Sequence, residues 1–288
     1  MASPSERERV LVTGLIGFTG DHLGPALESE GYQVFDLDCD IRDPRAVTER
    51  VLSVHPDVVI HLAGIANVAH ADTGEMYHVN VIGSRNLFAA LGRLTTPPRN
   101  TIIAGSATVY GNTPVSPITE ESPLNPRNDY GVTKAAVELL IGIWGDRLPY
   151  TILRPFNYTG PGQTTNFVIP KIVDHFRRRA ETIDLGNTRV VREYGDVRRT
   201  VAAYTRLAAR RGTNEIYNVA TGTGVTLDEV IAHCSALTGH SLRVVVNPRF
   251  VRSNEVHTLI GSPAKIESYL GPLPEYSIED TLRWMLDS

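Results

Sequence analysis

In the first half of the chain, short and largely apolar runs of strand length alternate with longer amphipathic stretches. The strand-like runs lie at residues 10–13, 33–38, 58–62, 101–104 and 150–153, and the helical stretches lie near 20–30, 44–53, 77–94 and 129–145. Apolar strands separated by helices are typical of a parallel sheet that is covered on both faces. The alternation therefore predicts an α/β fold, a doubly wound parallel sheet.

The alternation ends after Arg154. Residues 157–166 are rich in Gly, Thr and Asn, which predicts a loop that leaves the sheet. A further strand is expected at 215–219, a helix at 226–238 with a capping box formed by Thr226 and Glu229, a short strand at 242–246 and a terminal helix at 277–286. We expect a large domain of residues 9–160 and 188–235, and a small C-terminal lobe of residues 161–187 and 236–288.

Composition argues against several classes of protein. The formal net charge of −4 does not fit a dedicated nucleic-acid-binding protein, which normally has a strongly basic face. No apolar run approaches the ~20 residues that a membrane span needs, and we expect no signal peptide. Cys39 and Cys234 form neither a disulfide framework nor a metal cluster, which favours a reducing cytoplasm. We expect a cytoplasmic protein that acts on a small molecule without a metal.

Gly14, Gly17 and Gly20 follow the first predicted strand with G-x-x-G-x-x-G spacing and open the next helix, with Ile16 and Phe18 between them. Such glycines permit a tight turn and let a pyrophosphate approach backbone N–H groups at a helix N-terminus. A strand–helix turn without a ligand is the alternative. Because the motif has the required position near the N-terminus, it predicts a dinucleotide-binding site formed by these five residues.

Asp38 ends the second predicted strand, about 20 residues beyond the glycine turn, where a carboxylate can accept hydrogen bonds from the adenosine ribose. A carboxylate there repels a 2′-phosphate, which favours NAD(H) over NADP(H). Asp36 competes for this role, and Arg42 could restore phosphate binding, so NADP(H) stays possible. Asp40 and Ile41 suit the adenine edge, although a helix N-cap region explains Asp40 equally well.

Tyr130 and Lys134 are spaced i, i+4, so they share one face of a predicted helix. A cation beside a phenol lowers the pKa of the phenol, which would let Tyr130 exchange a proton near neutral pH. Ser106 follows the fourth strand, at the sheet edge where doubly wound folds bind ligands, and can donate to a substrate oxygen. Thr108 either contacts the substrate or caps its own turn. A solvent-facing pair without function is the alternative for Tyr130 and Lys134.

Together, the glycine turn, the Ser106 loop and the Tyr130–Lys134 pair resemble those of extended short-chain dehydrogenases/reductases, in the nucleotide-sugar epimerase/dehydratase branch. The resemblance covers essentially the whole chain beyond residue 8. It implies a Rossmann fold and an NAD(P)-dependent oxidoreductase in which Ser106, Tyr130 and Lys134 are catalytic and the last two also contact the cofactor. The segment after the third strand resembles the family's cofactor loop, which implies contacts from Leu62, Ala63 and Gly64.

Other segments extend the resemblance. Asn80 matches a helix asparagine near the family's catalytic centre. Residues 154–157 and 160–163 resemble the segment that meets the nicotinamide and the sugar diphosphate, which implies a cofactor contact for Pro155 and a substrate contact for Asn157. Arg192 matches an arginine that holds a nucleotide diphosphate, for which a bidentate guanidinium is suited. The family often has an acidic residue at the position of Arg199, which leaves the pairing of Arg199 open.

Residues 252–256 and 259–261 are similar to a segment of GDP-mannose dehydratases and GDP-4-keto-6-deoxymannose reductases. An arginine and a glutamate of that segment hold the nucleotide phosphate and ribose, which implies these roles for Arg252 and Glu255. The alternative is a surface Arg–Glu pair. The resemblance therefore favours a GDP-linked nucleotide sugar, bound by the small lobe.

The family's dehydratases carry a carboxylate just after the catalytic Ser or Thr, whereas Ala107 and Thr108 follow Ser106 here. The resemblance thus implies an NAD(P)H-dependent reductase of the C4 ketone of GDP-4-keto-6-deoxy-D-mannose, serving deoxysugar and polysaccharide biosynthesis. An NAD-dependent nucleotide-sugar C4 epimerase is the alternative. A non-enzymatic regulator that senses dinucleotides would not need Ser106, Tyr130 and Lys134 together. Subunit pairing in the family, through helices equivalent to residues 77–94 and 129–145, implies a homodimer.

Overall fold

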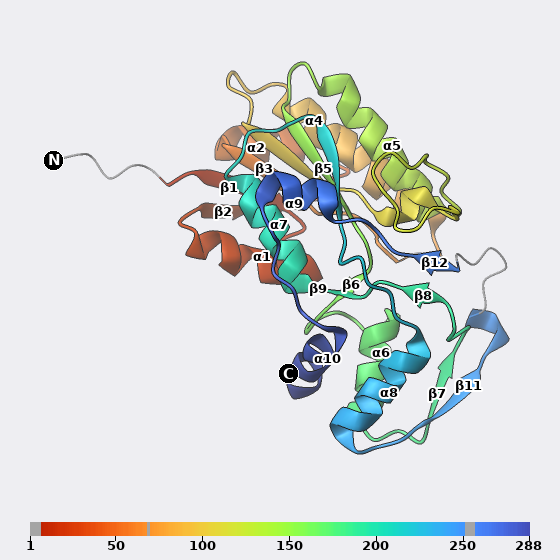
Figure 1. Cartoon of the computed structure of the whole chain (residues 1–288). Helices are drawn as coiled ribbons and strands as arrows, with labels where there is room; N and C mark the ends of the chain where they lie inside the picture. The colour runs from red at the N-terminus through yellow and green to blue at the C-terminus, as the bar shows by residue number, and fades with distance from the viewer. Residues whose placement is uncertain (1–6, 68–69, 251–256) are drawn as a thin grey trace.

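The computed structural model describes residues 7–67, 70–250 and 257–288. Its main sheet has six strands in the order β10-β5-β4-β3-β1-β2, and every neighbouring pair is parallel. The doubly wound parallel sheet is therefore confirmed (Figure 1). The strands are β1 (Arg9–Thr13), β2 (Gln33–Asp36), β3 (Val58–His61), β4 (Asn100–Ala104), β5 (Tyr150–Pro155) and β10 (Glu215–Val219).

Helices cover both faces of this sheet. Because successive side chains of a strand point to opposite faces, Val10 and Val12 of β1 enter one core and Leu11 enters the other. The first core includes α1 (Phe18–Ser29) and α7 (Val197–Ala208). The second includes α2 (Pro44–Val54), α4 (Ser84–Leu91) and α5 (Asp129–Trp144).

The direction of winding reverses at β1. From β1 the chain passes to β2 on one side, and β3 then pairs with β1 on the other, with Thr13 opposite His61 at the carboxyl ends. In open α/β sheets, ligands bind outside the carboxyl ends of the strands at such a reversal. The loops that follow β1 and β3 therefore border the expected ligand crevice.

The helix expected at residues 77–94 consists of three elements. They are α3 (Thr73–Tyr77), a six-residue π-helical segment η1 (His78–Gly83), and α4. Gly83 of the π-helical segment packs closely on Ile41, because a Cβ at Gly83 would lie 2.6 Å from Ile41 Cγ2. Wider helical turns of this kind are frequent at functional sites.

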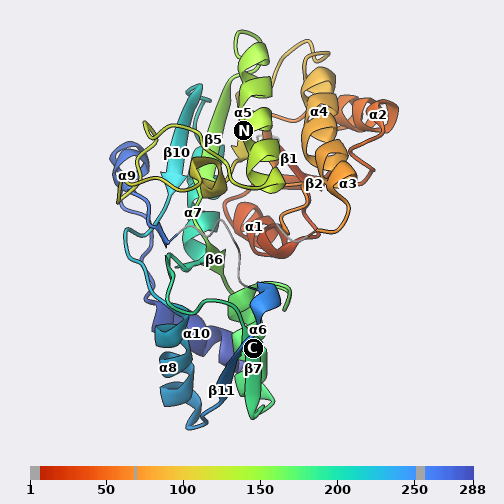
Figure 2. The same ribbon diagram turned by 90° about the vertical axis from the view of Figure 1, so that its right-hand side faces the viewer.

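A third core lies on one side of the sheet domain (Figure 2). It is built from α6 (Val168–Arg177), α8 (Leu227–Thr238), α10 (Ile278–Asp287) and the parallel pair β7 (Thr182–Leu185) and β11 (Arg243–Val246). The capping box of Thr226 and Glu229 is confirmed at the start of α8. The expected domain bounds put most of α8 in the large domain and α9 (Ala264–Leu270) in the lobe, but α8 packs in the third core and Ile266 of α9 packs in the first.

Two short parallel pairs lie between the main sheet and the third core (Figure 1). Strand β6 (Tyr158–Thr159), within the region expected to be a loop, pairs with β9 (Gly195–Asp196), and β8 (Val191–Arg192) pairs with β12 (Thr258–Leu259). Within the three described ranges, no helix has the length and apolar character needed to cross a membrane.

The pairing of Arg199, which the sequence left open, is clear in the structure. Arg199 is 4% exposed on α7. Its guanidinium donates to Glu267 Oε1 of α9 at 2.7 Å and to the carbonyl oxygens of Ala220, Leu273 and Pro274 at 3.0, 3.2 and 3.1 Å. Arg199 therefore holds α9 and the segment that follows it against the sheet domain through these hydrogen bonds.

Candidate active site

The glycine turn between β1 and α1 forms a cradle that side chains would fill. Gly14 has a φ of +77°, and a Cβ there would lie 3.0 Å from the backbone N of Ala63. A Cβ on Gly20 would collide with the carbonyl oxygen of Leu15. Gly17 is the N-cap of α1, and no described side chain caps this helix end. Uncapped N–H groups at a closely approachable helix N-terminus fit a pyrophosphate, so these residues suit a dinucleotide.

The loop after β3 packs against this turn through a chain of hydrogen bonds. Thr13 Oγ1 accepts from Ala63 N at 3.1 Å and lies 2.6 Å from His61 Nδ1. His61 Nε2 lies 2.8 Å from Ser84 Oγ, which donates to the carbonyl of Asn80. Burial lowers the pKa of His61 to about 3. The ring is therefore neutral at physiological pH and connects the turn to the helix that covers it.

Asn80, in the π-helical segment η1, connects the cofactor loop to α5. Its Nδ2 donates to Ile65 O at 3.1 Å and to Thr133 Oγ1 at 3.0 Å, and its Oδ1 accepts from Ile65 N at 2.7 Å. Thr133 Oγ1 in turn donates to Tyr130 O. The amide thereby fixes the loop that follows Gly64 relative to the first turns of α5.

Ser106 and Tyr130 form a hydrogen-bonded pair at the carboxyl end of β4. Ser106 Oγ accepts from Thr108 N at 3.2 Å and from Thr108 Oγ1 at 2.8 Å, which leaves the Ser106 proton for another acceptor. Ser106 is thus the residue that caps this turn, and the Thr108 hydroxyl binds the capping oxygen rather than its own backbone. Burial raises the pKa of Tyr130 to about 12, and a hydrogen bond with Ser106 offsets part of this rise.

Lys134 completes the group but does not act on Tyr130 as predicted. Its Nζ donates to Ala104 O at 2.8 Å and lies 5.9 Å from the centroid of the Tyr130 ring. Burial lowers the pKa of Lys134 to about 8, and Glu138 opposes this effect. The prediction that Lys134 lowers the pKa of Tyr130 was wrong for this structure, because burial of the phenol dominates. A Cβ on Gly64 would lie 3.5 Å from Lys134 Nζ, so the lysine reaches the cofactor loop.

Strand β2 ends two residues earlier than predicted. Asp36 is its last residue, and Asp36 Oδ1 accepts from Leu15 N of the glycine turn at 3.4 Å. Asp38, the residue expected to end the strand, is exposed, and its backbone has a left-handed conformation with a φ of +51°. Asp40 binds Arg42 through contacts of 2.7–3.0 Å, so Arg42 is already paired.

The remaining residues that were predicted to contact the cofactor differ in exposure. Ile16 is 88% exposed at the glycine turn, and the Phe18 ring stacks on Tyr158 at a centroid distance of 5.8 Å. Ile41 is buried against Gly83. Pro155 is the buried last residue of β5, at the same sheet edge as Ser106.

On the substrate side, β8 and β12 bring two predicted segments together. Arg192 lies on β8, whose neighbour Val191 donates its N–H to the carbonyl of His257 at 2.9 Å. Arg252 and Glu255 lie outside the described residues, and the described chain resumes at His257. Asn157 is half-buried, and its carbonyl accepts from Gly195 N.

Glu193, beside Arg192, had no assigned role in the sequence. It is 1% exposed, and its carboxylate accepts from the backbone N–H groups of Thr221, Gly222 and Gly261 at 2.8, 3.1 and 2.7 Å. Burial raises the pKa of Glu193, and the three N–H donors oppose the rise. The carboxylate therefore fixes the strand that carries Arg192 against the loop after β10.

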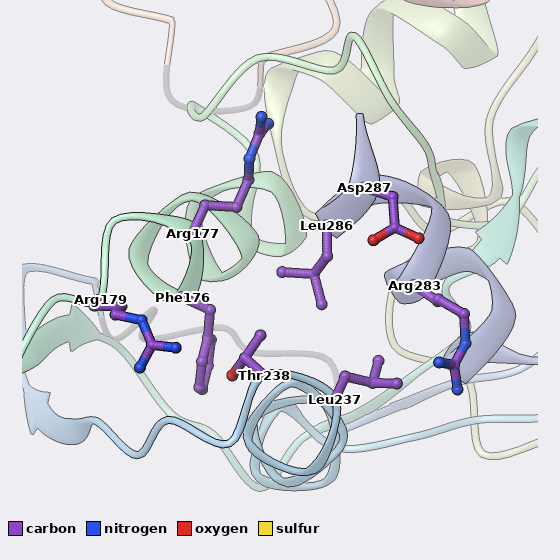
Figure 3. Close-up of a pocket in the computed structure, with 8 residues that line it drawn as sticks. All are labelled: Phe176, Arg177, Arg179, Leu237, Thr238, Arg283, Leu286 and Asp287. Atoms are coloured by element: carbon purple, nitrogen blue, oxygen red, sulfur yellow. The ribbon is translucent and has the colours of Figure 1, made fainter.

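Two hollows lie outside the catalytic group. One, of about 340 Å³, opens at the glycine turn and is lined by Leu15, Ile16 and the outer side of α1. The other, of about 400 Å³, lies among the ends of α6, α8 and α10 (Figure 3). No predicted site residue lines this second hollow, and the guanidinium groups of Arg177 and Arg283 point away from each other.

The sequence analysis gave no individual role to Glu138 or Arg154, two buried charged residues near the site. Glu138 and Arg154 form an ion pair of 2.6 Å behind Ser106 and Lys134. The signal in the sequence was a charge inside an otherwise apolar run, at Glu138 four residues after Lys134 and at Arg154 at the end of β5.

Comparison with known proteins gives consistent similarities. Residues 35–285 match the family model described as GDP-mannose 4,6 dehydratase. The chain is 32% identical over 294 residues to GDP-6-deoxy-D-mannose reductase of Pseudomonas aeruginosa, with 97% of this chain and 96% of that protein covered. It is 30% identical over 268 residues to GDP-6-deoxy-D-talose 4-dehydrogenase of Aggregatibacter actinomycetemcomitans, with 91% of each covered. The solved structure of RMD from P. aeruginosa, complexed with NADPH, superposes with a TM-score of 0.89 at 31% identity, covering 97% of this chain and 98% of that one.

Proposed function

The chain belongs to the family described as GDP-mannose 4,6 dehydratase, and on that premise we propose that it is an NAD(P)H-dependent nucleotide-sugar 4-ketoreductase. Its substrate is GDP-4-keto-6-deoxy-D-mannose and its product a GDP-6-deoxyhexose. The observation that carries the proposal is the convergence of Ser106, Tyr130 and Lys134 beside the glycine turn. Ala107 and Thr108 supply no carboxylate for dehydration, which favours simple reduction over the reaction in the family's description.

Each of the three side chains has a distinct role in this proposal. NAD(P)H, when bound, supplies the hydride that C4 receives. Tyr130, kept protonated by burial, donates its proton to O4, and Ser106 donates a hydrogen bond that polarises the carbonyl. Lys134 holds the cofactor ribose and places a positive charge beside the developing alkoxide. Holding these groups in place removes part of the entropic barrier, a contribution of several kcal/mol in favourable cases.

We propose that the sheet domain binds the dinucleotide and that the small lobe closes the nucleotide-sugar site. Asn157 and Arg192, with Arg252 and Glu255 in the segment before His257, would hold the GDP moiety, and Thr108 would contact the sugar. The pairing of β8 with β12 supports this arrangement, because it brings Arg192 next to the strand that follows that segment.

The acidic end of β2 supports a preference for NAD(H), with NADP(H) also accepted. Replacing both Asp36 and Asp38 with Asn is expected to improve kcat/KM for NADPH relative to NADH by about tenfold, the effect of ~1.4 kcal/mol of lost repulsion. Steady-state kinetics with both cofactors measure this ratio. An unchanged ratio would show that neither carboxylate faces the ribose. Asp43→Asn, at the N-cap of α2, is the control.

We further propose that the enzyme is a homodimer. Leu139 and Ile143 are 70% and 78% exposed on α5, one helical turn apart, and Val132 and Ile82 are also exposed on the helices of this face. A single apolar stripe of this kind suits burial against a second copy.

The reaction itself suits deoxysugar and polysaccharide biosynthesis in the cytoplasm, without a nucleic-acid or membrane partner.

The double substitution Leu139→Glu/Ile143→Glu is expected to convert the dimer to a monomer, because it buries like charges in an apolar contact. Light scattering coupled to size exclusion measures the mass of each form. Leu52→Glu, an exposed leucine on α2, is the matched control. A dimer that survives both α5 substitutions would place the interface elsewhere.

Incubation with a panel of keto-sugar nucleotides tests the proposed reaction. The purified protein is mixed with each nucleotide and either NADH or NADPH, and the absorbance of reduced cofactor and the sugar products are followed. Stoichiometric oxidation of the cofactor with the GDP-linked ketone is expected. Interconversion of C4 epimers without consumption of reductant would identify the alternative, a C4 epimerase.

A further inference from the structure

A buried ion pair lies directly behind the catalytic group. The side chains of Arg154 on β5 and Glu138 on α5 are 3% and 4% exposed. Arg154 Nε donates to Glu138 Oε1 at 2.9 Å and Nη2 donates to Oε2 at 2.6 Å, a bidentate geometry. Arg154 Nη1 also donates to Tyr110 Oη at 2.8 Å, and Tyr110 donates to Asn218 Oδ1 at 2.7 Å. The guanidinium thus binds the carboxylate at both oxygens, and it also binds Tyr110, which contacts Asn218 of β10.

The pair contacts the segments that carry Ser106 and Lys134. Glu138 follows Lys134 by one helical turn and lies on the same face of α5. A Cβ on Gly105, the residue before Ser106, would lie 2.9 Å from Glu138 Oε1. The strand end that presents Ser106 therefore rests on the Glu138 carboxylate.

Stability alone gives little reason for such a pair. Burying two charges costs about as much free energy as their attraction returns, and apolar residues of similar volume are often equally stable or more stable. Arg154 and Glu138 are therefore expected to contribute something other than free energy of unfolding. Because the pair lies beside the segments that carry Ser106 and Lys134, we expect it to affect the charge and the placement of these two side chains.

The electrostatic surroundings of Lys134 are simple. On α5 it is faced by Tyr130, which is neutral, and by Glu138. On β3 it is faced by His61, which is also neutral because burial lowers its pKa to about 3. Burial lowers the pKa of Lys134 to about 8 and Glu138 acts in the opposite direction. Arg154 on β5 pairs with Glu138, and the Glu138 carboxylate, one helical turn from Lys134, is the negative charge that favours the Lys134 cation.

Building on the function proposed above, we infer that Glu138 and Arg154 are positioning residues of the reaction. Glu138 keeps Lys134 cationic at neutral pH, and Arg154 holds the carboxylate against Gly105, behind Ser106. A lysine is cationic below its pKa, so loss of the Glu138 carboxylate lets Lys134 lose its proton at lower pH. The alkaline limb of the pH–rate profile then moves to lower pH.

The titration of Lys134 can be observed without substrate or cofactor. The chain has three lysines, Lys134, Lys171 and Lys265, so lysine-selective isotope labelling gives three side-chain NMR signals. Lys171→Arg and Lys265→Arg assign them. In the full-length wild-type chain, the Lys134 signal is expected to titrate with a midpoint near the pKa of about 8.

Two variants remove the charge with different changes in packing. Glu138→Met/Arg154→Met replaces the pair with apolar side chains of similar volume, and Glu138→Gln removes the carboxylate alone. Glu138→Gln, which leaves the Arg154 cation unpaired, is expected to lower the Lys134 midpoint by about one pH unit, and Glu138→Met/Arg154→Met, which removes both charges, is expected to lower it by less. The alkaline limb of kcat should shift by the same amount. Glu138→Asp, which keeps a carboxylate, should restore most of the midpoint, and Tyr110→Phe, which leaves the ion pair intact, should not move it.

An unchanged Lys134 midpoint in a folded variant that lacks the carboxylate would overturn the inference. Failure of both charge-removing variants to fold, judged by circular dichroism and thermal unfolding, would also overturn it and would identify the pair as purely structural. Because the NMR titration requires no turnover, it is independent of the proposed substrate. A shifted midpoint in a protein that reduces no keto sugar would support the positioning role and contradict the proposed function.

Discussion

Replacing Tyr130 with Phe is expected to lower kcat at least ~10²-fold, as for the loss of a general acid. The substitution removes one oxygen from a partly buried ring and leaves the packing of α5 intact. Burial raises the pKa of Tyr130 to about 12, so the wild-type hydroxyl stays protonated and able to donate across the neutral range. Cofactor binding should change little, because the Lys134 ammonium and the glycine turn remain.

The matched control is Tyr77→Phe. The Tyr77 hydroxyl donates to Asp129 Oδ1 at 3.1 Å, at the start of α5 and outside the catalytic group. Steady-state assays with the GDP-linked ketone give kcat for each variant. Titration with NADH gives the cofactor affinity. Near-normal turnover of Tyr130→Phe would remove this residue from the proposed mechanism.

Replacing Arg192 with Met is expected to raise KM for the nucleotide sugar roughly 10- to 100-fold. This range follows from ~1.5–3 kcal/mol for hydrogen bonds between a charged donor and a phosphate. Because the diphosphate is remote from C4, the change in kcat should be small. Initial rates over a range of sugar concentrations, at saturating cofactor, separate the two constants.

Arg178→Met serves as the control for Arg192→Met. Arg178 is an exposed arginine at the end of α6 and pairs with Asp174 at 3.0 Å. A fall in kcat without a rise in KM would move Arg192 from substrate binding to support of the catalytic group. An unchanged KM would place the diphosphate elsewhere in the lobe.

The sheet and its glycine turn were predictable because their signals are local. Apolar runs such as 58–62 need burial on both faces whatever the rest of the chain does, and the glycine spacing limits the turn that follows β1. The segment from 168 to 208 was harder. Helix α7 carries apolar residues at Val197, Val201 and Tyr204, but three arginines in the same helix obscured the pattern. Its buried arginine, Arg199, is satisfied only by groups that lie far away in the sequence.

The chemistry of the site was less predictable than its location. Spacing placed Tyr130 and Lys134 on one helix face, but burial, which controls the pKa of Tyr130, depends on the surrounding fold. The end of β2 at Asp36 is set by its register with β1, which the sequence does not encode locally. The Glu138–Arg154 pair joins residues on different elements, so only the folded chain reveals it.

The most direct measurement of the central claim is the fate of the transferred hydrogen. The full-length protein is supplied with NADH or NADPH carrying deuterium at both positions of C4 of the nicotinamide, together with GDP-4-keto-6-deoxy-D-mannose, and the sugar product is examined by NMR and mass spectrometry. The account predicts one deuterium, bound at C4 of the product hexose, with oxidised cofactor formed in equal amount. A product formed without deuterium at C4, or oxidised cofactor without a reduced sugar, would contradict it.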